Sequence, residues 1–149
     1  MKKYLVDTNI ISYLADIESR FHENVRTRFR NLSGDDEVFL SILGLYEFYY
    51  SFSRASAGLN PDILRAREKM LTTLPVVPLS RRGGQIFGEL KTLYQNHYQL
   101  PGTALARDTV DLMIASSALE IGAILVSHDG VFQKIQTIRP DLEVQDWAL

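Results

Sequence analysis

The chain has 149 residues, and this length predicts a single domain over residues 1–149. A composition of 46% hydrophobic and 23% charged residues excludes a disordered chain, and the lack of cysteine excludes disulfides and thiolate metal sites. The net charge of −2 argues against a protein that coats nucleic acid through charge alone, although it allows a nucleic-acid enzyme with a local basic patch.

The N-terminal half predicts strands that alternate with helices. The apolar run at residues 3–7 has the character of a buried strand, and apolar residues then recur at helical spacing. The predicted elements are, in order, a strand at 3–7, helices at 8–16 and 19–32, a strand at 38–42 and a helix at 43–55.

The C-terminal half continues the alternation. Its first helix begins with a cap-like Asn60 and with Pro61 at the first helical position. The predicted elements are a helix at 60–74, a short strand within 75–80, a helix at 80–99, a loop at 100–106, a helix at 108–121, a strand at 123–127, a helix at 131–135 and an edge strand at 142–148.

This alternation predicts an α/β fold with a mainly parallel sheet and helices on both of its faces. Ligands bind outside the carboxyl ends of the strands in such sheets. No apolar run reaches the length of a membrane span, and Asp7, Asn9 and Asp16 interrupt the N-terminal run that otherwise suggests a signal peptide. We therefore expect a cytoplasmic protein.

Four carboxylates fall near the predicted carboxyl ends of the strands, where ligands bind in such sheets. Asp7 ends the first strand, Asp129 follows the strand at 123–127, and Glu47 and Asp111 lie near the starts of helices. Like charges that share one cleft repel and need a cation unless they are partly protonated. An all-oxygen ligand set favours Mg²⁺ or Mn²⁺, and such ions serve phosphodiester hydrolysis by water.

Each of these acids also has a plain structural interpretation. Asp7 could cap a helix, and Asp111 could interact favourably with the dipole at a helix start. Asp129 is a common residue type in turns, and Glu47 could lie on a solvated helix surface. We prefer the metal-ligand interpretation because the four acids occur together. Asp108 is left open between a helix cap and a part of the metal site.

Several neighbouring side chains also keep two interpretations. Thr8 and Asn9 either begin a helix or hold Asp7 or a metal-bound water. Arg107 either binds a phosphate or pairs with Asp108, and we interpret His128 as a bystander rather than a general base. We assign most of an aromatic group to the core or a dimer interface, and most of the clustered arginines, a group that contains Arg65 and Arg67, to solvated helix faces. The aromatic group is Tyr46, Phe48, Tyr49, Tyr50 and Phe52.

Four segments carry a resemblance to a known family. They read "YLVDTNIISYL", "LYEFYYS", "DLMIASSALEIGAILVSHDGVF" and "VQDW". Together they resemble PIN-domain ribonucleases, in particular the VapC toxins of bacterial and archaeal toxin–antitoxin pairs. The resemblance implies a PIN-like three-layer α/β/α fold. It assigns the acidic site to Asp7, Glu47, Asp111 and Asp129.

The resemblance also implies Mg²⁺- or Mn²⁺-dependent cleavage of RNA, a homodimer, and an antitoxin whose C-terminal segment blocks the cleft. Ser127 stands where the family usually has threonine and supplies the same hydroxyl, whereas Asp108 is an additional acid. Residues 56–105 carry no motif of the family, and we expect them to shape substrate or partner specificity.

Three other functions remain as alternatives. One is a PIN-like module that binds RNA or protein without cutting, and another is a related nuclease outside toxin–antitoxin systems, acting on DNA or RNA. The third is a phosphatase with Asp7 as the nucleophile, which is disfavoured because Asn9 stands where that chemistry needs a second acid.

Overall fold

The computed structural model of the chain describes residues 1–54, 58 and 60–149. Its centre is a five-stranded sheet in which all neighbouring strands are parallel, in the order β3-β2-β1-β4-β5. The strands are β1 (Lys3–Val6), β2 (Glu37–Ser41), β3 (Val76–Val77), β4 (Ile124–Val126) and β5 (Val144–Gln145). The prediction of a mainly parallel sheet is confirmed.

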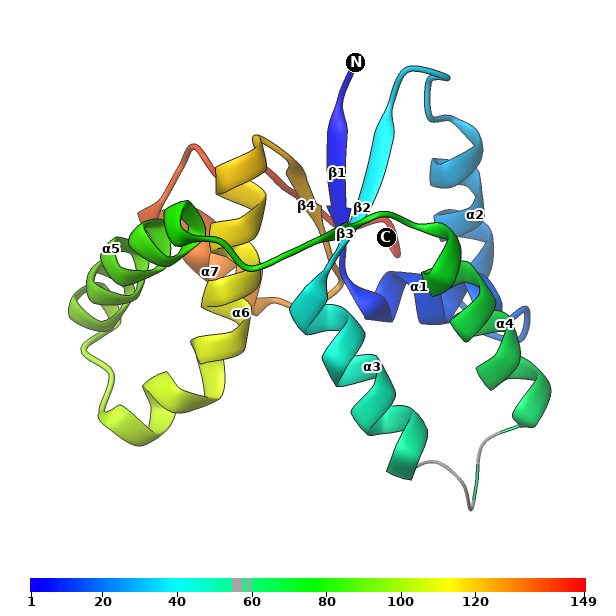
Figure 1. The fold of residues 1–149 in the computed structure, drawn as a ribbon, viewed down its shortest axis with the longest axis horizontal. Helices are drawn as coiled ribbons and strands as arrows, with labels where there is room; N and C mark the ends of the chain where they lie inside the picture. Colours follow the sequence, from blue (N-terminus) through cyan, green and yellow to red (C-terminus); the bar gives the residue numbers. More distant parts are fainter. Residues whose placement is uncertain (55–57, 59) are drawn as a thin grey trace.

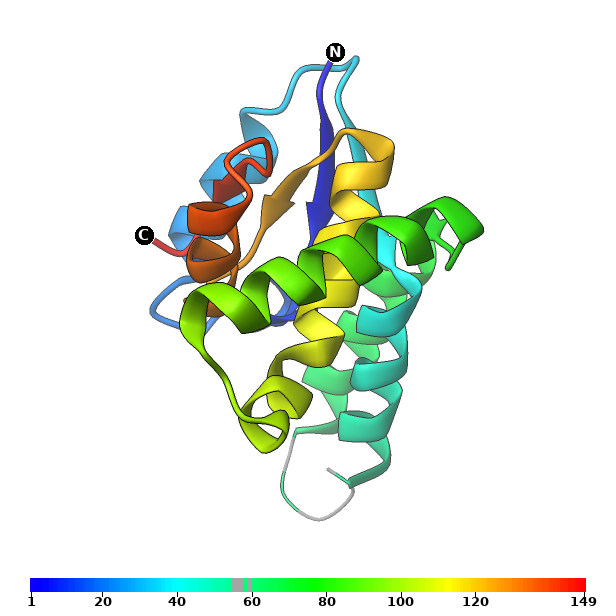
Figure 2. The same ribbon diagram turned by 90° about the vertical axis from the view of Figure 1, so that its left-hand side faces the viewer.

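Seven helices flank the sheet in the described part of the chain (Figure 1). They are α1 (Thr8–Ala15), α2 (His22–Arg30), α3 (Ile42–Arg54), α4 (Pro61–Thr73), α5 (Arg81–Tyr98), α6 (Gly102–Ile121) and α7 (Val131–Ile138). Helices α5, α6 and α7 lie on one face, with α5 crossing α6 (Figure 2), and α1, α2 and α4 lie on the other. This is the predicted α/β/α arrangement.

The central strands contribute to a hydrophobic core on each face of the sheet. Leu5 packs into the core beneath α5, α6 and α7, whereas Tyr4 and Val6 pack into the core beneath α1, α2 and α4. A strand buried on both faces reads as a continuous apolar run, as β1 and β4 do. The strands β1 and β4 are direct neighbours, so their carboxyl ends lie at the same edge.

The start of α6 differs from the sequence-based prediction. The segment at 100–106 was expected to be a loop, but α6 begins at Gly102 with Pro101 as its N-cap residue. Proline is tolerated there because the first turn of a helix leaves its backbone N–H groups unpaired in any case. Asp111 therefore lies midway along α6 rather than in its first turn, and of the two interpretations left open for Asp108, the helix cap is excluded.

The other boundaries follow the prediction more closely. Asn60 caps α4, and its Oδ1 accepts a hydrogen bond from the Asp62 backbone N–H at 2.9 Å. The strand predicted within 75–80 is reduced to Val76–Val77, and the helix end predicted at residue 55 lies outside the described residues. Among the helices that the structure describes, none is both long and apolar enough to cross a bilayer.

Candidate functional site

Asp7 is fixed at the junction between β1 and α1. Its backbone N–H donates to the Val126 carbonyl at 2.8 Å, which ties it to the end of β4. One carboxylate oxygen caps α1 by accepting from the Thr8 backbone N–H at 2.8 Å, as a capping aspartate does. The other oxygen accepts from the Ser127 hydroxyl at 2.8 Å. Asp7 is therefore both a helix cap and a strand-end carboxylate of fixed orientation.

The Ser127 hydroxyl connects three segments of this region. Ser127 is completely buried, and its Oγ donates to Asp7 while it accepts from Asn9 Nδ2 at 3.3 Å and from the Asp129 backbone N–H at 3.0 Å. Asp129 itself is exposed and accepts from the Val131 backbone N–H at 3.1 Å, which starts α7. Asn9 thus reaches the carboxylate of Asp7 only through the serine.

Glu47 and Asp111 approach the same edge of the sheet from α3 and α6. Glu47 is exposed next to the buried Phe48, and Asp111 is partly buried. Burial, and after it the negative charges of the neighbouring acids, together raise the pKa of Asp111 to about 7. These acids are, in decreasing order of effect, Asp129, Asp7, Glu47 and Asp108.

The other two central acids show the same mutual repulsion. Burial raises the pKa of Glu47, and the charges of Asp7 and Asp129 add to this rise. Burial also raises the pKa of Asp7, and this outweighs the opposing hydrogen bonds from Ser127 and Thr8. The charges of Asp7, Glu47 and Asp129 all act on Asp111, so the four acids lie near one another at the carboxyl edge of the sheet.

Asp108 and His128 have clear structural partners, whereas Arg107 has none among the described residues. The Tyr94 hydroxyl of α5 donates to Asp108 Oδ2 at 2.7 Å, so Asp108 holds α5 to α6. Arg107 is exposed and, within the described chain, forms no ion pair with Asp108. His128 Nδ1 lies 2.7 Å from Asp146 Oδ2, and its ring packs against Phe21.

The donor set fits a hard divalent cation in its chemistry. All four acids offer oxygen, and Asn9 Oδ1 is buried without a hydrogen-bond partner among the described residues. In the described part of the chain, however, no three acidic or histidine side chains converge closely enough to form a complete ligand group. Mg²⁺ does not need such a group, because it is usually bound by one or two carboxylates plus water and substrate phosphates.

The sequence model of the PIN domain family matches residues 4–138. The chain belongs to the PIN domain family. No curated protein matches it in sequence. The family match contains all four acids of the cleft together with Ser127.

Solved structures of VapBC toxin–antitoxin complexes share this fold. VapBC2 from Rickettsia felis, bound to a promoter DNA fragment, has a TM-score of 0.75 at 23% identity, covering 97% of this chain and 98% of that chain. VapBC-1 from nontypeable Haemophilus influenzae has a TM-score of 0.71 at 24% identity and covers 99% of both chains. VapC20 from Mycobacterium tuberculosis, a toxin that cleaves the sarcin–ricin loop, has a TM-score of 0.59 at 16% identity, covering 87% and 92%.

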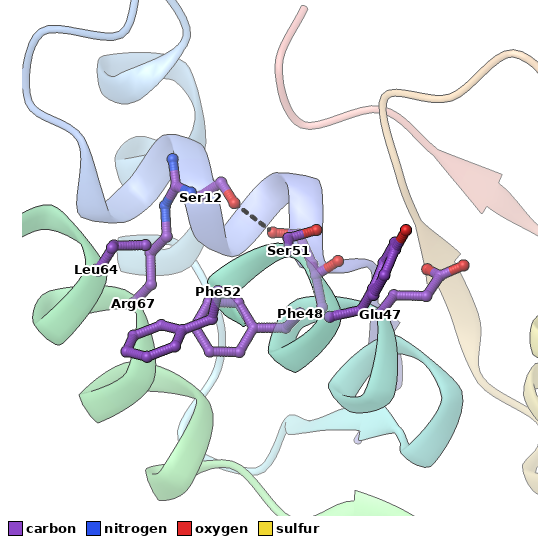
Figure 3. Close-up of a pocket in the computed structure, with 9 residues that line it drawn as sticks. Ser12, Glu47, Phe48, Ser51, Phe52, Leu64 and Arg67 are labelled. Carbon is purple, nitrogen blue, oxygen red and sulfur yellow. Dashed lines mark hydrogen bonds between the residues drawn. The ribbon is translucent and has the colours of Figure 1, made fainter. Parts of the chain in front are cut away.

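A pocket beside the acids contains a residue that the sequence analysis assigned to a solvated face. The pocket has a volume of about 340 Å³ and lies between α1, α3 and α4, with Glu47 and Arg67 in its lining (Figure 3). A signal for Arg67 was present in the sequence, because it occupies the apolar stripe of its helix between Leu64 and Leu71. A charged residue on an otherwise apolar helix face is a candidate functional residue.

Proposed function

We propose that the chain is a metal-dependent endoribonuclease that forms one nuclease domain over residues 1–149 and acts as the toxin of a toxin–antitoxin pair. The observation that carries the proposal is the group of four acids at the carboxyl edge of the sheet in a PIN fold, in which Asp7, Glu47 and Asp129 all raise the pKa of the partly buried Asp111. Such a set of charges is unfavourable without a cation. Carboxylates at this edge suit metal-dependent phosphodiester hydrolysis.

The residues of the chain take distinct parts in this proposal. Asp7, Glu47, Asp111 and Asp129 would hold Mg²⁺ or Mn²⁺, which when bound activates water and neutralises charge at the phosphate. Ser127 and the Thr8 N–H orient the Asp7 carboxylate through the two hydrogen bonds described above.

We assign less direct roles in the proposed reaction to other side chains near the cleft. Asn9 presents beside Ser127 an amide oxygen that has no partner in the part of the chain that the structure describes. Asp108 and Tyr94 fix the part of α6 that carries Asp111. Arg107 keeps its assignment as a phosphate-binding residue, because it is exposed and, in the described ranges, has no carboxylate partner.

The proposal includes an RNA substrate, an antitoxin and a homodimer in the cytoplasm. The similarity to VapBC complexes supports the antitoxin, and the sarcin–ricin loop cleaved by VapC20 supports RNA as the substrate class. Exposed apolar side chains support a protein interface, since Tyr46 on α3 is 70% exposed and Leu79 beyond β3 is 55% exposed. The two also line one shallow pocket, so they form a single surface.

A second candidate is a PIN-like module that binds RNA or protein without cutting. The observation that favours it is the absence, among the described residues, of three converging ligands for one ion. The binding module predicts no uptake of metal, whereas the nuclease predicts that Mn²⁺ binds and draws the acids together. Calorimetry with Mn²⁺ on the intact chain separates these two outcomes.

Cleavage of RNA tests the proposed function directly. We expect the purified chain, free of antitoxin, to cut a mixed RNA pool with Mg²⁺ or Mn²⁺, to stop with EDTA, and to lose activity in Asp7→Asn. The asparagine keeps an acceptor for the Thr8 N–H and a polar partner for Ser127, so circular dichroism should show an unchanged fold. A folded wild-type chain that cuts no RNA of the pool with either metal contradicts the proposal.

A further inference from the structure

Arg67 lies on the face of α4 that packs against the rest of the protein. Leu64 and Leu71, three residues before it and four residues after it, are both buried. A solvated arginine belongs on the opposite face, where the Arg65 side chain is 71% exposed and pairs with Asp62. Arg67 therefore occupies a position that helical periodicity assigns to an apolar residue.

The guanidinium of Arg67 has no neutralising partner within the described chain. Its Nε is buried without a hydrogen-bond partner, and it forms no ion pair with a described carboxylate. An unpaired buried donor or charge is costly, and such exceptions are rare in native proteins. A bound anion would neutralise the charge of this guanidinium.

The pocket around Arg67 has the size and chemistry for such an anion. In Figure 3, Arg67 reaches towards Ser12 of α1, while Glu47 lies at the opposite end of the pocket. The volume of about 340 Å³ falls at the lower end of the range for ligand sites, so one phosphate with its sugar fits but a longer segment does not. Hydroxyl and aromatic groups line the space between the two ends, from Ser12, Ser51, Phe48 and Phe52.

We propose that this pocket binds a backbone phosphate of the RNA strand one position away from the cut, and that Arg67 holds this phosphate. The inference rests on the proposed nuclease function. The planar guanidinium matches phosphate oxygens in a bidentate manner, and aromatic rings pack against a sugar or base. The Ser51 hydroxyl can donate to the phosphate, whereas the Ser12 hydroxyl already donates to the Thr8 carbonyl at 3.0 Å.

The position of Glu47 connects the two sites. Glu47 belongs both to the acid cleft and to the lining of this pocket, so a strand cut at the cleft continues directly towards Arg67. The acids repel an approaching polyanion, and the chain as a whole carries a net charge of −2. A fixed cation beside the cleft offsets this repulsion on the path of the substrate.

RNA binding by matched variants of α4 tests the assignment. Arg67→Met removes the charge and keeps an apolar stem, and Arg65→Met makes the same change on the solvent face of the same helix. Binding of a short fluorescent single-stranded RNA is measured in the Asp7→Asn background, which prevents cleavage. We expect Arg67→Met to weaken binding about ten- to hundredfold, as for a lost hydrogen bond to a charged group, and Arg65→Met to change it by less than about twofold.

The salt dependence and the kinetics add independent measurements. The slope of log affinity against log salt should fall by about 0.7 in Arg67→Met, as expected for one phosphate contact with a single strand. With Asp7 intact, KM should rise while kcat changes little, because Arg67 lies away from the reacting atoms. Equal affinities and slopes for folded Arg67→Met and Arg65→Met would overturn the assignment.

Two further measurements test the assignment even if Arg67→Met does not fold. Arg67→Lys keeps the charge without the planar fork, so we expect an affinity between those of wild type and Arg67→Met. In the wild-type chain, titration with inorganic phosphate should shift the NMR signal of the Arg67 Nε–H group, identified by its absence in Arg67→Lys. No shift at millimolar phosphate, together with unchanged RNA binding by Arg67→Lys, counts against the phosphate site.

The result also separates this inference from the proposed function. A wild-type chain that cuts no RNA but loses RNA binding on Arg67→Met refutes the nuclease and retains the phosphate site. A chain that cuts RNA equally well with and without Arg67 retains the nuclease and refutes the site. Loss of affinity for an acidic peptide with unchanged RNA affinity refutes it as well, because it assigns the pocket to a protein partner.

Discussion

Asp7 and Asp129 come from the carboxyl ends of β1 and β4, whereas Glu47 and Asp111 come from the sides of α3 and α6. On the strand side, the Ser127 hydroxyl and two backbone N–H groups orient the carboxylates. On the helix side, no hydrogen bond to either carboxylate is present in the described part of the chain. One half of the cleft is preorganised by hydrogen bonds, and the other half is positioned only by helix packing.

This difference explains why the acids affect one another without forming a complete ligand group. The strand side has a fixed geometry, whereas burial and the charges of the other acids raise the pKa values of the helix-borne Glu47 and Asp111, and no ligand group is complete among the described residues. Under the proposed function, a bound cation would offset this charge and allow the helix side to complete the site. Four variants or conditions test this contrast, and we take them from the largest expected effect to the smallest.

Asp111→Asn is expected to have opposite effects on activity and stability. Cleavage should fall by more than about a hundredfold, because even groups that only orient metal ligands account for 10- to 100-fold. The metal-free fold should become more stable at pH 8, since one of several repelling charges is gone. Cleavage rates and urea unfolding in EDTA measure the two effects. Lower metal-free stability would show that Asp111 is held by contacts rather than strained by charge.

Ser127→Ala tests the strand side. It removes the donor to Asp7 and the acceptor for the Asp129 N–H, so we expect about 10- to 100-fold slower cleavage and a loss of about 1–3 kcal/mol in unfolding free energy. Ser116→Ala is the matched control, because Ser116 is also buried but bonds only to the Leu112 carbonyl within α6. Similar activity losses in both variants would indicate that Ser127 contributes through packing and not by orienting the acids.

The pH dependence of stability tests the helix side without mutation. The pKa of Asp111 is raised from 3.8 to about 7, so the folded state binds more protons than the unfolded state between these values. Stability in EDTA should therefore fall as the pH rises from 5 to 8, on the order of 1–2 kcal/mol once solvent screening of the partly exposed carboxyl is included. Mn²⁺ should restore the loss at pH 8. Stability that rises over this range would contradict the proposed repulsion.

Tyr94→Phe is expected to have the smallest effect. It removes the hydrogen bond to Asp108 and should lower the unfolding free energy by about 0.5–1.5 kcal/mol. A fewfold loss of cleavage should accompany it if α5 aligns Asp111 through Asp108. Tyr98→Phe is the control, because its hydroxyl bonds to the Lys134 carbonyl instead. Equal activity in the two variants would limit the Tyr94 contact to stability.

The strand side of the site was predictable from sequence and the helix side only in part. A continuous apolar run followed by Asp7, and another followed by Ser127 and Asp129, locate these side chains because a strand has to end at the sheet edge. The register of a helix depends on where it begins, and the Pro–Gly pair at 101–102 was interpreted as part of a loop although it starts α6. Asp111 was consequently assigned to the wrong turn.

Arg67 shows a different limit of the sequence. Its place in the apolar stripe was readable, but three arginine or lysine residues within five positions of α4 suggested a solvated face. Only packing distinguishes the exposed Arg65 from the inward Arg67. The pocket itself needs α1, α3 and α4 together, which no local pattern specifies.

The hydrogen bond between Ser127 and Asp7 also has a consequence for the timing of synthesis. The two residues lie 120 positions apart, and β1 occupies the centre of the sheet between β2 and β4. At about 5–20 residues per second, a ribosome needs roughly 6–24 s between adding Asp7 and adding Ser127, which orients the Asp7 carboxylate. A growing chain therefore contains no complete cleft until the ribosome has made most of the protein.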